Sequence, residues 1–246
     1  MCLVIPAASS RTQPDIHWPD PTGESMAQRL NWFLDFDETL ATSPLTWALK
    51  YAFPRLIENH QLAYDAARFE QAILVAQERS NQEPDPRPVL HALFETLGWP
   101  HEYEVPLLHD IMNNYAPELF DDAVPFLEQA RARQHRLYLV SNNPMSVRHV
   151  EQLGLAAYFD GLYTAKLLNS QPKPHRGLWD EIVRARPEIQ DYPTIIVGDD
   201  PWSDGLFAEN CGLPCWIIDR MNRFTSLHDS KPYRWAHTLL EIAADA

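Results

Sequence analysis

The chain has 246 residues and a formal net charge of −14, with 34 acidic against 20 basic side chains. Such a balance disfavours nucleic acid and anionic membranes as partners, because like charges repel at long range, and leaves small anionic substrates open. No apolar run is long enough to span a bilayer. The three cysteines make no disulfide framework, and the first residues lack the basic start and apolar core of a secretory signal. We therefore expect a cytoplasmic location.

The first part of the chain predicts one strand followed by a block of helices. Residues 1–25 show no periodicity and predict a flexible tail. Residues 32–36 predict a short buried strand. Apolar residues then recur at helical spacing within residues 44–118, in segments 45–60, 64–77, 89–99 and 104–116. Pro54, Pro100 and the proline-rich stretch 81–88 predict the breaks between these helices.

The remaining sequence alternates between strands and helices. Strands are predicted at residues 136–140, 194–198 and 215–219, and helices at 123–133, 145–153, 178–185, 202–210 and 235–244. Alternation of this kind predicts a parallel sheet with helices on both faces. The chain order therefore predicts an α/β domain of residues 26–43 and 119–246, with the helical block inserted after the first strand.

Two aspartates lie at the end of the first predicted strand, separated by one residue, in the segment FLDFDETL. Residues i and i+2 of an extended strand point the same way, so Asp35 and Asp37 can face one site. Two carboxylates this close need a compensating charge, and a hard cation such as Mg²⁺ prefers oxygen ligands. A polar turn is the alternative, with Thr39 and Ser43 acting as helix caps.

Three further polar segments lie at or near the carboxyl ends of predicted strands, where open α/β sheets bind ligands. VSNNP places Ser141 and Asn142 before a helix N-terminus, which favours anions. QPKP holds Lys173 between two prolines. The segment GDDPWSD contributes the carboxylates of Asp199, Asp200 and Asp204. Taken singly, each segment also fits an ordinary loop, and the scattered histidines show no metal-ligand spacing to one another.

In this order the segments DFDETL, VSNNP, QPKP and VGDDPWSD resemble the four motifs of the haloacid dehalogenase-like (HAD) hydrolase superfamily, over residues 32–219. The resemblance implies a Rossmann-like α/β core and makes residues 44–118 an all-α cap domain. It implies a Mg²⁺-dependent phosphatase that hydrolyses a small phosphomonoester through an aspartyl-phosphate intermediate.

The resemblance also implies a role for each matched residue. Asp35 would be the nucleophile and Asp37 the general acid and base. The substrate phosphate would be bound by Ser141, Asn142 and Lys173, the last of which is also catalytic. Mg²⁺ would be held by Asp35, Asp199 and the main-chain carbonyl of Asp37, with Asp204 in support. Asp200 stands at a variable motif position, to which no role carries over.

Three alternatives remain at this level. A dehalogenase is disfavoured, because a halide needs no proton on leaving whereas Asp37 can supply one. A phosphomutase would use every residue named above. A non-catalytic binding protein could keep the same fold. The sequence does not distinguish sugar phosphates, phosphoglycolate and nucleotides as substrates.

Overall fold

The computed structural model describes Trp18, residues 29–80 and residues 86–245. Within this part of the chain, six parallel strands form one sheet in the order β3-β2-β1-β4-β5-β6. The strands are β1 (Asn31–Leu34), β2 (Arg136–Ser141), β3 (Gly161–Thr164), β4 (Thr194–Gly198), β5 (Cys215–Ile218) and β6 (Arg234–Ala236). This confirms the predicted Rossmann-like α/β architecture.

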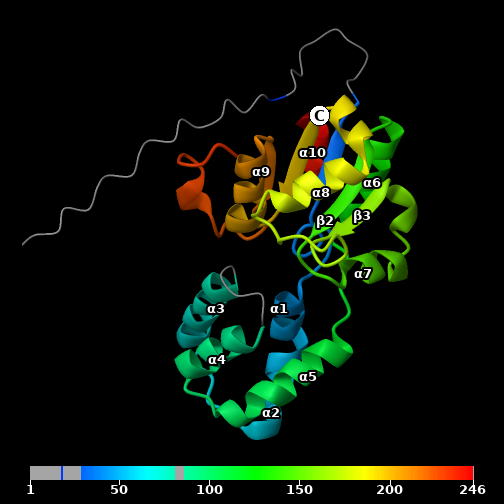
Figure 1. The fold of residues 1–246 in the computed structure, drawn as a ribbon. Helices are drawn as coiled ribbons and strands as arrows, with labels where there is room; N and C mark the ends of the chain where they lie inside the picture. Colours follow the sequence, from blue (N-terminus) through cyan, green and yellow to red (C-terminus); the bar gives the residue numbers. More distant parts are fainter. Residues whose placement is uncertain (1–17, 19–28, 81–85, 246) are drawn as a thin grey trace, which may run out of the picture.

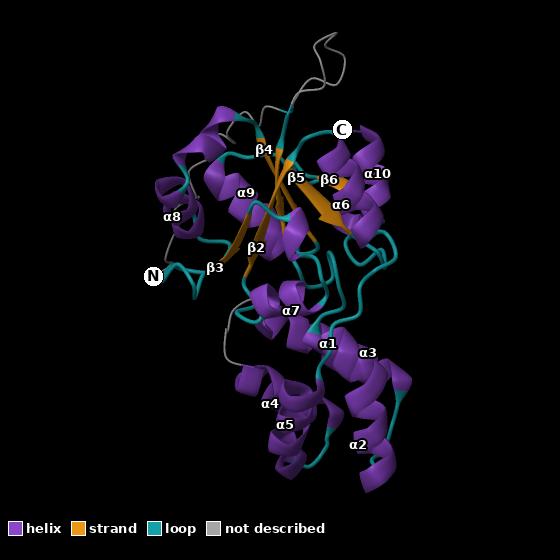
Figure 2. Cartoon of the chain, turned by 90° about the vertical axis from the view of Figure 1, so that its right-hand side faces the viewer, coloured by secondary structure: helices purple, strands orange, loops and turns teal. Residues whose placement is uncertain are grey.

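Alternate side chains of the central strands enter two separate apolar cores, because successive strand residues point to opposite faces. Trp32 and Leu34 belong to one core, and Phe33 belongs to the other. Figure 2 shows helices on both sides of the sheet. The first core is covered by α6 (Ala123–Ala132), α7 (Ser146–Gln152) and α10 (Leu239–Asp245), and the second by α8 (Gly177–Ala185) and α9 (Leu206–Cys211).

Short helical turns complete this α/β part. Three are 3-10 turns near its loops, namely η3 (Ala156–Tyr158), η4 (Pro187–Asp191) and η6 (Thr225–Leu227). The fourth, η5 (Pro201–Gly205), is a π turn that runs directly into α9. The helix predicted over residues 202–210 is therefore present, with a π turn as its first part.

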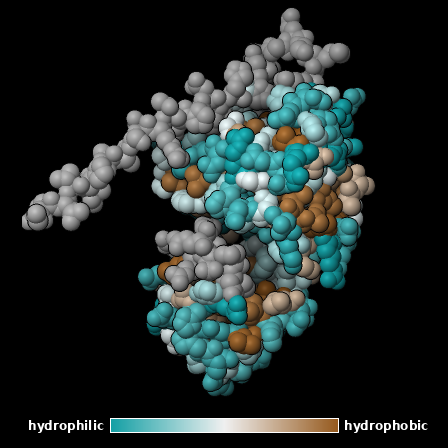
Figure 3. All heavy atoms as spheres, in the orientation of Figure 1, coloured by the Kyte–Doolittle hydropathy of each residue, from teal (hydrophilic) through white to brown (hydrophobic). Residues whose placement is uncertain are grey.

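Residues 44–115 form a separate helical unit beside the sheet, in which Tyr115 caps the last helix and packs against the core of the unit (Figure 1). Its elements are α1 (Pro44–Trp47), the π turn η1 (Ala48–Ala52), α2 (Phe53–His60), α3 (Ala66–Ser80), α4 (Pro86–Leu97), the 3-10 turn η2 (His101–Tyr103) and α5 (Glu104–Asn114). Buried side chains such as Phe53, Phe94 and Trp99 give this unit an apolar core of its own. The space-filling surface is notched between the two units (Figure 3).

The break predicted at Pro54 is wrong. The chain stays helical from α1 through η1 into α2, and the junction residues Ala52 and Phe53 keep right-handed helical dihedrals. Pro54 lies in the first turn of α2, directly after the π turn. The missing N–H of the proline thus falls where the hydrogen-bond pattern changes, so the helix tolerates it.

The sequence reading missed two edge strands and misplaced one helix. β3 and β6 have four and three residues, and the first two of each are only partly buried. Neither therefore forms a recognisable apolar run. β6 occupies the start of the segment predicted as a helix over residues 235–244, and α10 begins only at Leu239.

Most of the predicted tail lies outside the described residues. At Trp18, however, the chain packs against the α/β unit, with its ring edge-on to Trp216 at a centroid distance of 6.0 Å. The guanidinium group of Arg234 lies over the Trp18 ring, with its central carbon 4.1 Å from the ring centroid. The chain is therefore not loose at this residue.

Two connecting segments join the helical unit to the sheet, and they are bonded to each other. Thr42 donates its main-chain N–H to the Glu118 carbonyl at 2.9 Å, and Glu118 returns its N–H to the Thr42 hydroxyl at 3.0 Å. The Tyr115 hydroxyl donates to the Thr42 carbonyl at 2.6 Å. These bonds fix the helical unit next to the loop that follows β1.

Among the described residues, none of the helices combines the length and apolar character that crossing a bilayer requires.

Leu139→Ala will lower the free energy of unfolding by about 2–5 kcal/mol, because it removes buried methyl groups from a core that cannot fully close. Leu139 is fully buried in β2. The matched control is Leu167→Ala at a 63% exposed position, which should change stability by less than about 0.5 kcal/mol. Denaturant unfolding followed by circular dichroism measures both. Equal losses would contradict the described core.

Candidate active site

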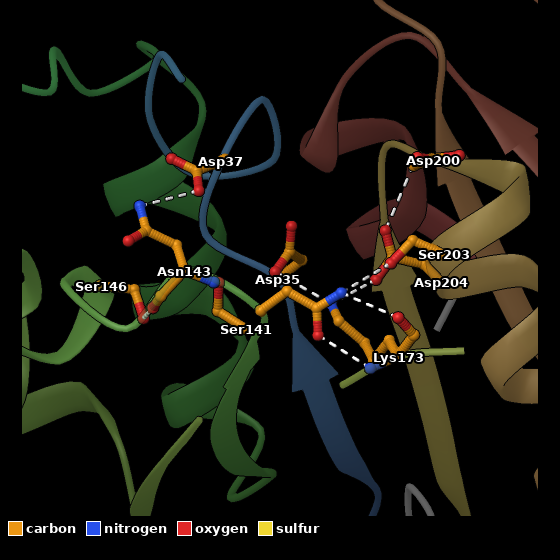
Figure 4. Close-up of polar contacts among 10 residues, drawn as sticks. Asp35, Asp37, Ser141, Asn143, Ser146, Lys173, Asp200, Ser203 and Asp204 are labelled. Atoms are coloured by element: carbon orange, nitrogen blue, oxygen red, sulfur yellow. Dashed lines mark hydrogen bonds and ion pairs between the residues drawn. The ribbon is translucent and has the colours of Figure 1, made fainter. Parts of the chain in front are cut away.

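The predicted polar residues meet at the carboxyl ends of three adjacent strands. Asp35 follows β1, Ser141 ends β2 and Asp199 follows β4, and β1 lies between the other two strands. From β1 the strand order runs outward through β2 to β3 on one side and through β4 and β5 to β6 on the other. Such a reversal of the strand order leaves a crevice at the carboxyl ends of the strands. Figure 4 shows Asp35 between Ser141 on one side and Lys173 with Asp204 on the other.

Lys173 bridges two of the carboxylates. Its Nζ lies 2.9 Å from Asp35 Oδ1 and 2.5 Å from Asp204 Oδ1, and its side chain is only 2% exposed. Burial alone would lower the pKa of Lys173, but the charges of Asp204 and Asp35 outweigh it and raise that pKa. Lys173 therefore stays charged and offsets the repulsion between the two acids.

Asn142 holds the segment that carries Lys173. Its side-chain oxygen accepts from the Lys173 main-chain N–H at 2.8 Å, and its amide nitrogen donates to the Lys173 carbonyl at 2.9 Å. The same nitrogen lies 3.3 Å from the Ser203 hydroxyl. The Asn142 side chain thus positions the lysine, and its predicted contact with phosphate stays a prediction.

The three aspartates after β4 have different surroundings. Asp200 Oδ1 accepts from the Trp202 N–H at 2.8 Å, so this carboxylate caps η5. Asp204 points back toward β4 and accepts from the Asp200 N–H at 3.2 Å. A Cβ atom at Gly198 would lie 2.0 Å from Asp204 Cγ, so this approach requires glycine.

The Asp199 carboxylate is close to both a second carboxylate and a guanidinium group. Burial and then the neighbouring Asp200 charge raise the pKa of Asp199 well above its usual range, and Arg223 opposes them. The guanidinium of Arg223 lies 3.0 Å from Asp199 Oδ2. Arg223 lies in the loop after β5, where its main-chain N–H donates to Asp219 Oδ1 at 2.7 Å.

The residues present fit a hard divalent cation. Asp35, Asp199 and Asp204 each offer one carboxylate oxygen, and these three oxygens lie within 4.8 Å of one another. Oxygen donors grouped in this way are the ligands that Mg²⁺ takes. The group contains all three side chains that the sequence predicted for the metal, and the predicted ligand from Asp37 is a main-chain carbonyl.

The Asp37 side chain is held apart from this group. β1 ends at Leu34, so Asp35, which the predicted strand of residues 32–36 included, lies with Asp37 in the loop that follows. Asn143 Nδ2 donates to Asp37 Oδ2 at 2.9 Å, and the Tyr115 hydroxyl lies 3.4 Å from Asp37 Oδ1 (Figure 4 shows Asp37 directed toward Asn143). Burial, followed by the charge of Asp35, raises the pKa of Asp37 to about 7. Such a group exchanges a proton readily near neutral pH.

Ser141 lies at the end of β2 and is buried. Its hydroxyl accepts from the Asn143 N–H at 3.2 Å, which leaves the hydroxyl proton free to be donated. This geometry suits the predicted contact with a phosphate oxygen, and the contact itself stays a prediction.

Three residues of the site were not identified from the sequence. Asn143 was part of the VSNNP segment, and its adjacency to Asn142 was the one available signal. Tyr115 ends the helical unit, and Arg223 lies in a loop with no recognisable motif. Only their distances to Asp37 and Asp199 reveal them.

Comparison with known proteins identifies the family of this chain. A family model for haloacid dehalogenase-like hydrolases matches residues 33–212. The chain therefore belongs to the haloacid dehalogenase-like hydrolases, as its four motifs predicted. No curated protein sequence matches it.

Solved structures share the fold at low sequence identity. YfnB from Bacillus subtilis, assigned as a HAD hydrolase and bound to magnesium, has a TM-score of 0.67 at 18% identity, over 88% of this chain and 98% of that one. A Thermotoga maritima protein assigned as a β-phosphoglucomutase has a TM-score of 0.65 at 17% identity, over 88% and 97%. A 2-haloacid dehalogenase from Pseudomonas syringae has a TM-score of 0.52 at 21% identity, over 89% and 97%. These structures share one fold but are assigned different activities, so the fold alone does not determine the reaction.

Lys173→Met will lower the free energy of unfolding by about 3 kcal/mol or more, because it leaves two buried carboxylates without their shared cation. The loss should be smaller in Mg²⁺ than in EDTA, since a bound cation restores part of the charge balance. The matched control is Lys50→Met, which removes the exposed pair with Glu118 and should cause no comparable loss. Denaturant unfolding in both buffers measures the effect, and an unchanged stability would show that the lysine does not compensate the acids.

Proposed function

We propose that this protein is a Mg²⁺-dependent phosphatase that hydrolyses a small phosphomonoester through an aspartyl-phosphate on Asp35. The observation that carries the proposal is the setting of Asp37. Its carboxyl group is directed away from the cation-binding acids and held by Asn143, and the Tyr115 hydroxyl lies nearby. A second acid held in this way suits proton transfer to an alkoxide, whereas a halide would not need it.

In the first step, a carboxylate oxygen of Asp35 attacks phosphorus while the bond from phosphorus to the leaving oxygen breaks. Asp37 donates its proton to that oxygen, and the product leaves as an alcohol. Lys173 keeps Asp35 ionised and oriented, since its Nζ contacts Asp35 Oδ1. Ser141 is placed to donate to a phosphoryl oxygen.

In the second step, water attacks the phosphorus of the aspartyl-phosphate, and Asp37 accepts a proton from that water. The bond from phosphorus to Asp35 breaks, which releases phosphate and restores the carboxylate. Asp35, Asp199, the Asp37 carbonyl and the supporting Asp204 would hold Mg²⁺. When bound, this ion supplies neutralisation of the charge on the phosphoryl oxygens.

The helical unit contributes to this site through Tyr115. The Tyr115 hydroxyl donates to the Thr42 carbonyl at 2.6 Å and also lies 3.4 Å from Asp37 Oδ1, where it can donate to the carboxylate. Tyr115 thus connects the helical unit to the loop that carries Asp37. Substrate specificity is proposed to come from this unit, because it adjoins the loop that carries Asp37.

The test is release of inorganic phosphate from a panel of phosphomonoesters, with Mg²⁺ and with EDTA. Wild-type protein should release phosphate only with Mg²⁺, and Asp35→Asn should lose about 10⁴-fold or more in turnover because it removes the nucleophile. Asp180→Asn, at an exposed position of α8, is the matched control and should keep full turnover. Near-normal release by Asp35→Asn would refute the nucleophile assignment, and transfer of phosphate within the substrate without release would indicate a mutase.

Asp37→Asn should separate the two chemical steps. Nitrophenolate leaves without a proton, so p-nitrophenyl phosphate should give a burst of about one equivalent of nitrophenol per enzyme and then stall. An alkyl phosphate should give no burst, because its alkoxide needs the proton of Asp37. Rapid-mixing absorbance and quenched-flow assays measure the two substrates. Sustained wild-type turnover of both would contradict the acid and base role.

A further inference from the structure

A second group of metal-ligating side chains lies in the helical unit. His91 is in α4, His101 opens the turn η2 and Glu104 is the first residue of α5. The histidines show no metal-ligand spacing along the sequence, and it is the fold that brings His91 and His101 together. Their ligand atoms and that of Glu104 lie within 4.8 Å of one another.

The two imidazoles converge on one carboxylate oxygen. His91 Nδ1 lies 3.0 Å from Glu104 Oε1, and His101 Nδ1 contacts the same oxygen. The rings stack with their centroids 4.5 Å apart and their planes at 23°. Two nitrogens and one oxygen therefore face a common point.

The backbone that carries these ligands is well anchored. Leu97, the last residue of α4, and Trp99, which lies between α4 and η2, are both buried in the core of the helical unit. The Trp99 indole N–H also donates to the Ala63 carbonyl at 2.8 Å. His101 and Glu104 follow on consecutive helical turns, so the three side chains need only small rotations to share a ligand.

Helix capping does not account for the Glu104 carboxylate. Tyr103 stands at the N-cap of α5, and no side-chain hydrogen bond caps this helix. The polar contacts described for the Glu104 side chain are those with the two histidines. Glu104 thus presents its carboxylate to two imidazole nitrogens.

We propose that His91, His101 and Glu104 form a second cation site, which binds Zn²⁺ or a similar transition metal and links α4 to α5. Two histidines and one glutamate are a common ligand set for Zn²⁺, and water completes the coordination. Imidazole nitrogen suits Zn²⁺, Ni²⁺ and Cu²⁺, whereas Mg²⁺ prefers oxygen, so the two sites of this chain select different metals. The side chains of His91 and His101 are 59% and 51% exposed, so an ion can reach the site from solvent.

Titration calorimetry with Zn²⁺ in excess Mg²⁺ tests this site without any assay of activity. Excess Mg²⁺ occupies the carboxylates at the strand ends and leaves the imidazoles free. Wild-type protein should bind one equivalent of Zn²⁺. His91→Ala and His101→Ala should each weaken this binding by about tenfold or more, since loss of groups that merely orient ligands already costs that much. Glu104→Gln, which keeps the side-chain size, should also weaken it.

His109→Ala is the matched control, because this histidine is exposed on α5 and outside the group. It should bind Zn²⁺ as the wild type does. Co²⁺ in place of Zn²⁺ gives a second measurement, a visible absorption band that the His91→Ala protein should lack. Absence of Zn²⁺ binding in the wild type, or binding that survives the combined His91→Ala and His101→Ala changes, would overturn the proposal. Because no catalytic residue is involved, either result is independent of the proposed phosphatase activity.

Discussion

Repulsion among closely spaced carboxylates is the constraint on which this structure depends. Asp35, Asp199 and Asp204 direct oxygens to one place at the edge of the sheet. Asp35 and Asp204 are buried and Asp199 is partly buried, so water screens their charges poorly and cationic side chains compensate them. Lys173 contacts two of the three acids and Arg223 contacts the other. These cations come from different loops, so the same charge balance that permits a metal site also ties separate parts of the chain together.

The order of the strands makes this crowding possible. With β1 between β2 and β4, the three strands that carry polar termini are neighbours. Helices fill both faces of the sheet and leave only the strand ends for a ligand. Gly198 then allows Asp204 to approach the end of β4 more closely than any side chain at that position would permit. The strand order places the acids together, and the lack of a side chain at Gly198 lets Asp204 join them.

The helical unit adds what the sheet cannot supply. Its last residue before the return to the sheet, Tyr115, reaches both Thr42 and Asp37. Together with Asn143, it holds the Asp37 side chain apart from the three acids whose oxygens converge at the strand ends, although only one residue separates Asp35 from Asp37 in the chain. The same unit carries a nitrogen-rich ligand group on its surface. A hard oxygen site and a borderline nitrogen site thus occur in different units of one chain.

The sequence by itself determined the family, the α/β class and most of the site, because strand-terminal residues of a parallel sheet must share one edge. Asp35, Ser141 and Asp199 could be named for that reason, whereas Lys173 and Asp204 were named from the resemblance of their segments to the family motifs. Only the tertiary structure decided which neighbouring side chains serve them. Asp200 caps a turn while Asp204 meets Lys173, a difference set by the backbone after β4. The remaining partners join segments far apart in the chain and leave no local pattern, as with Tyr115 at Asp37, Arg223 at Asp199, and His91 at Glu104.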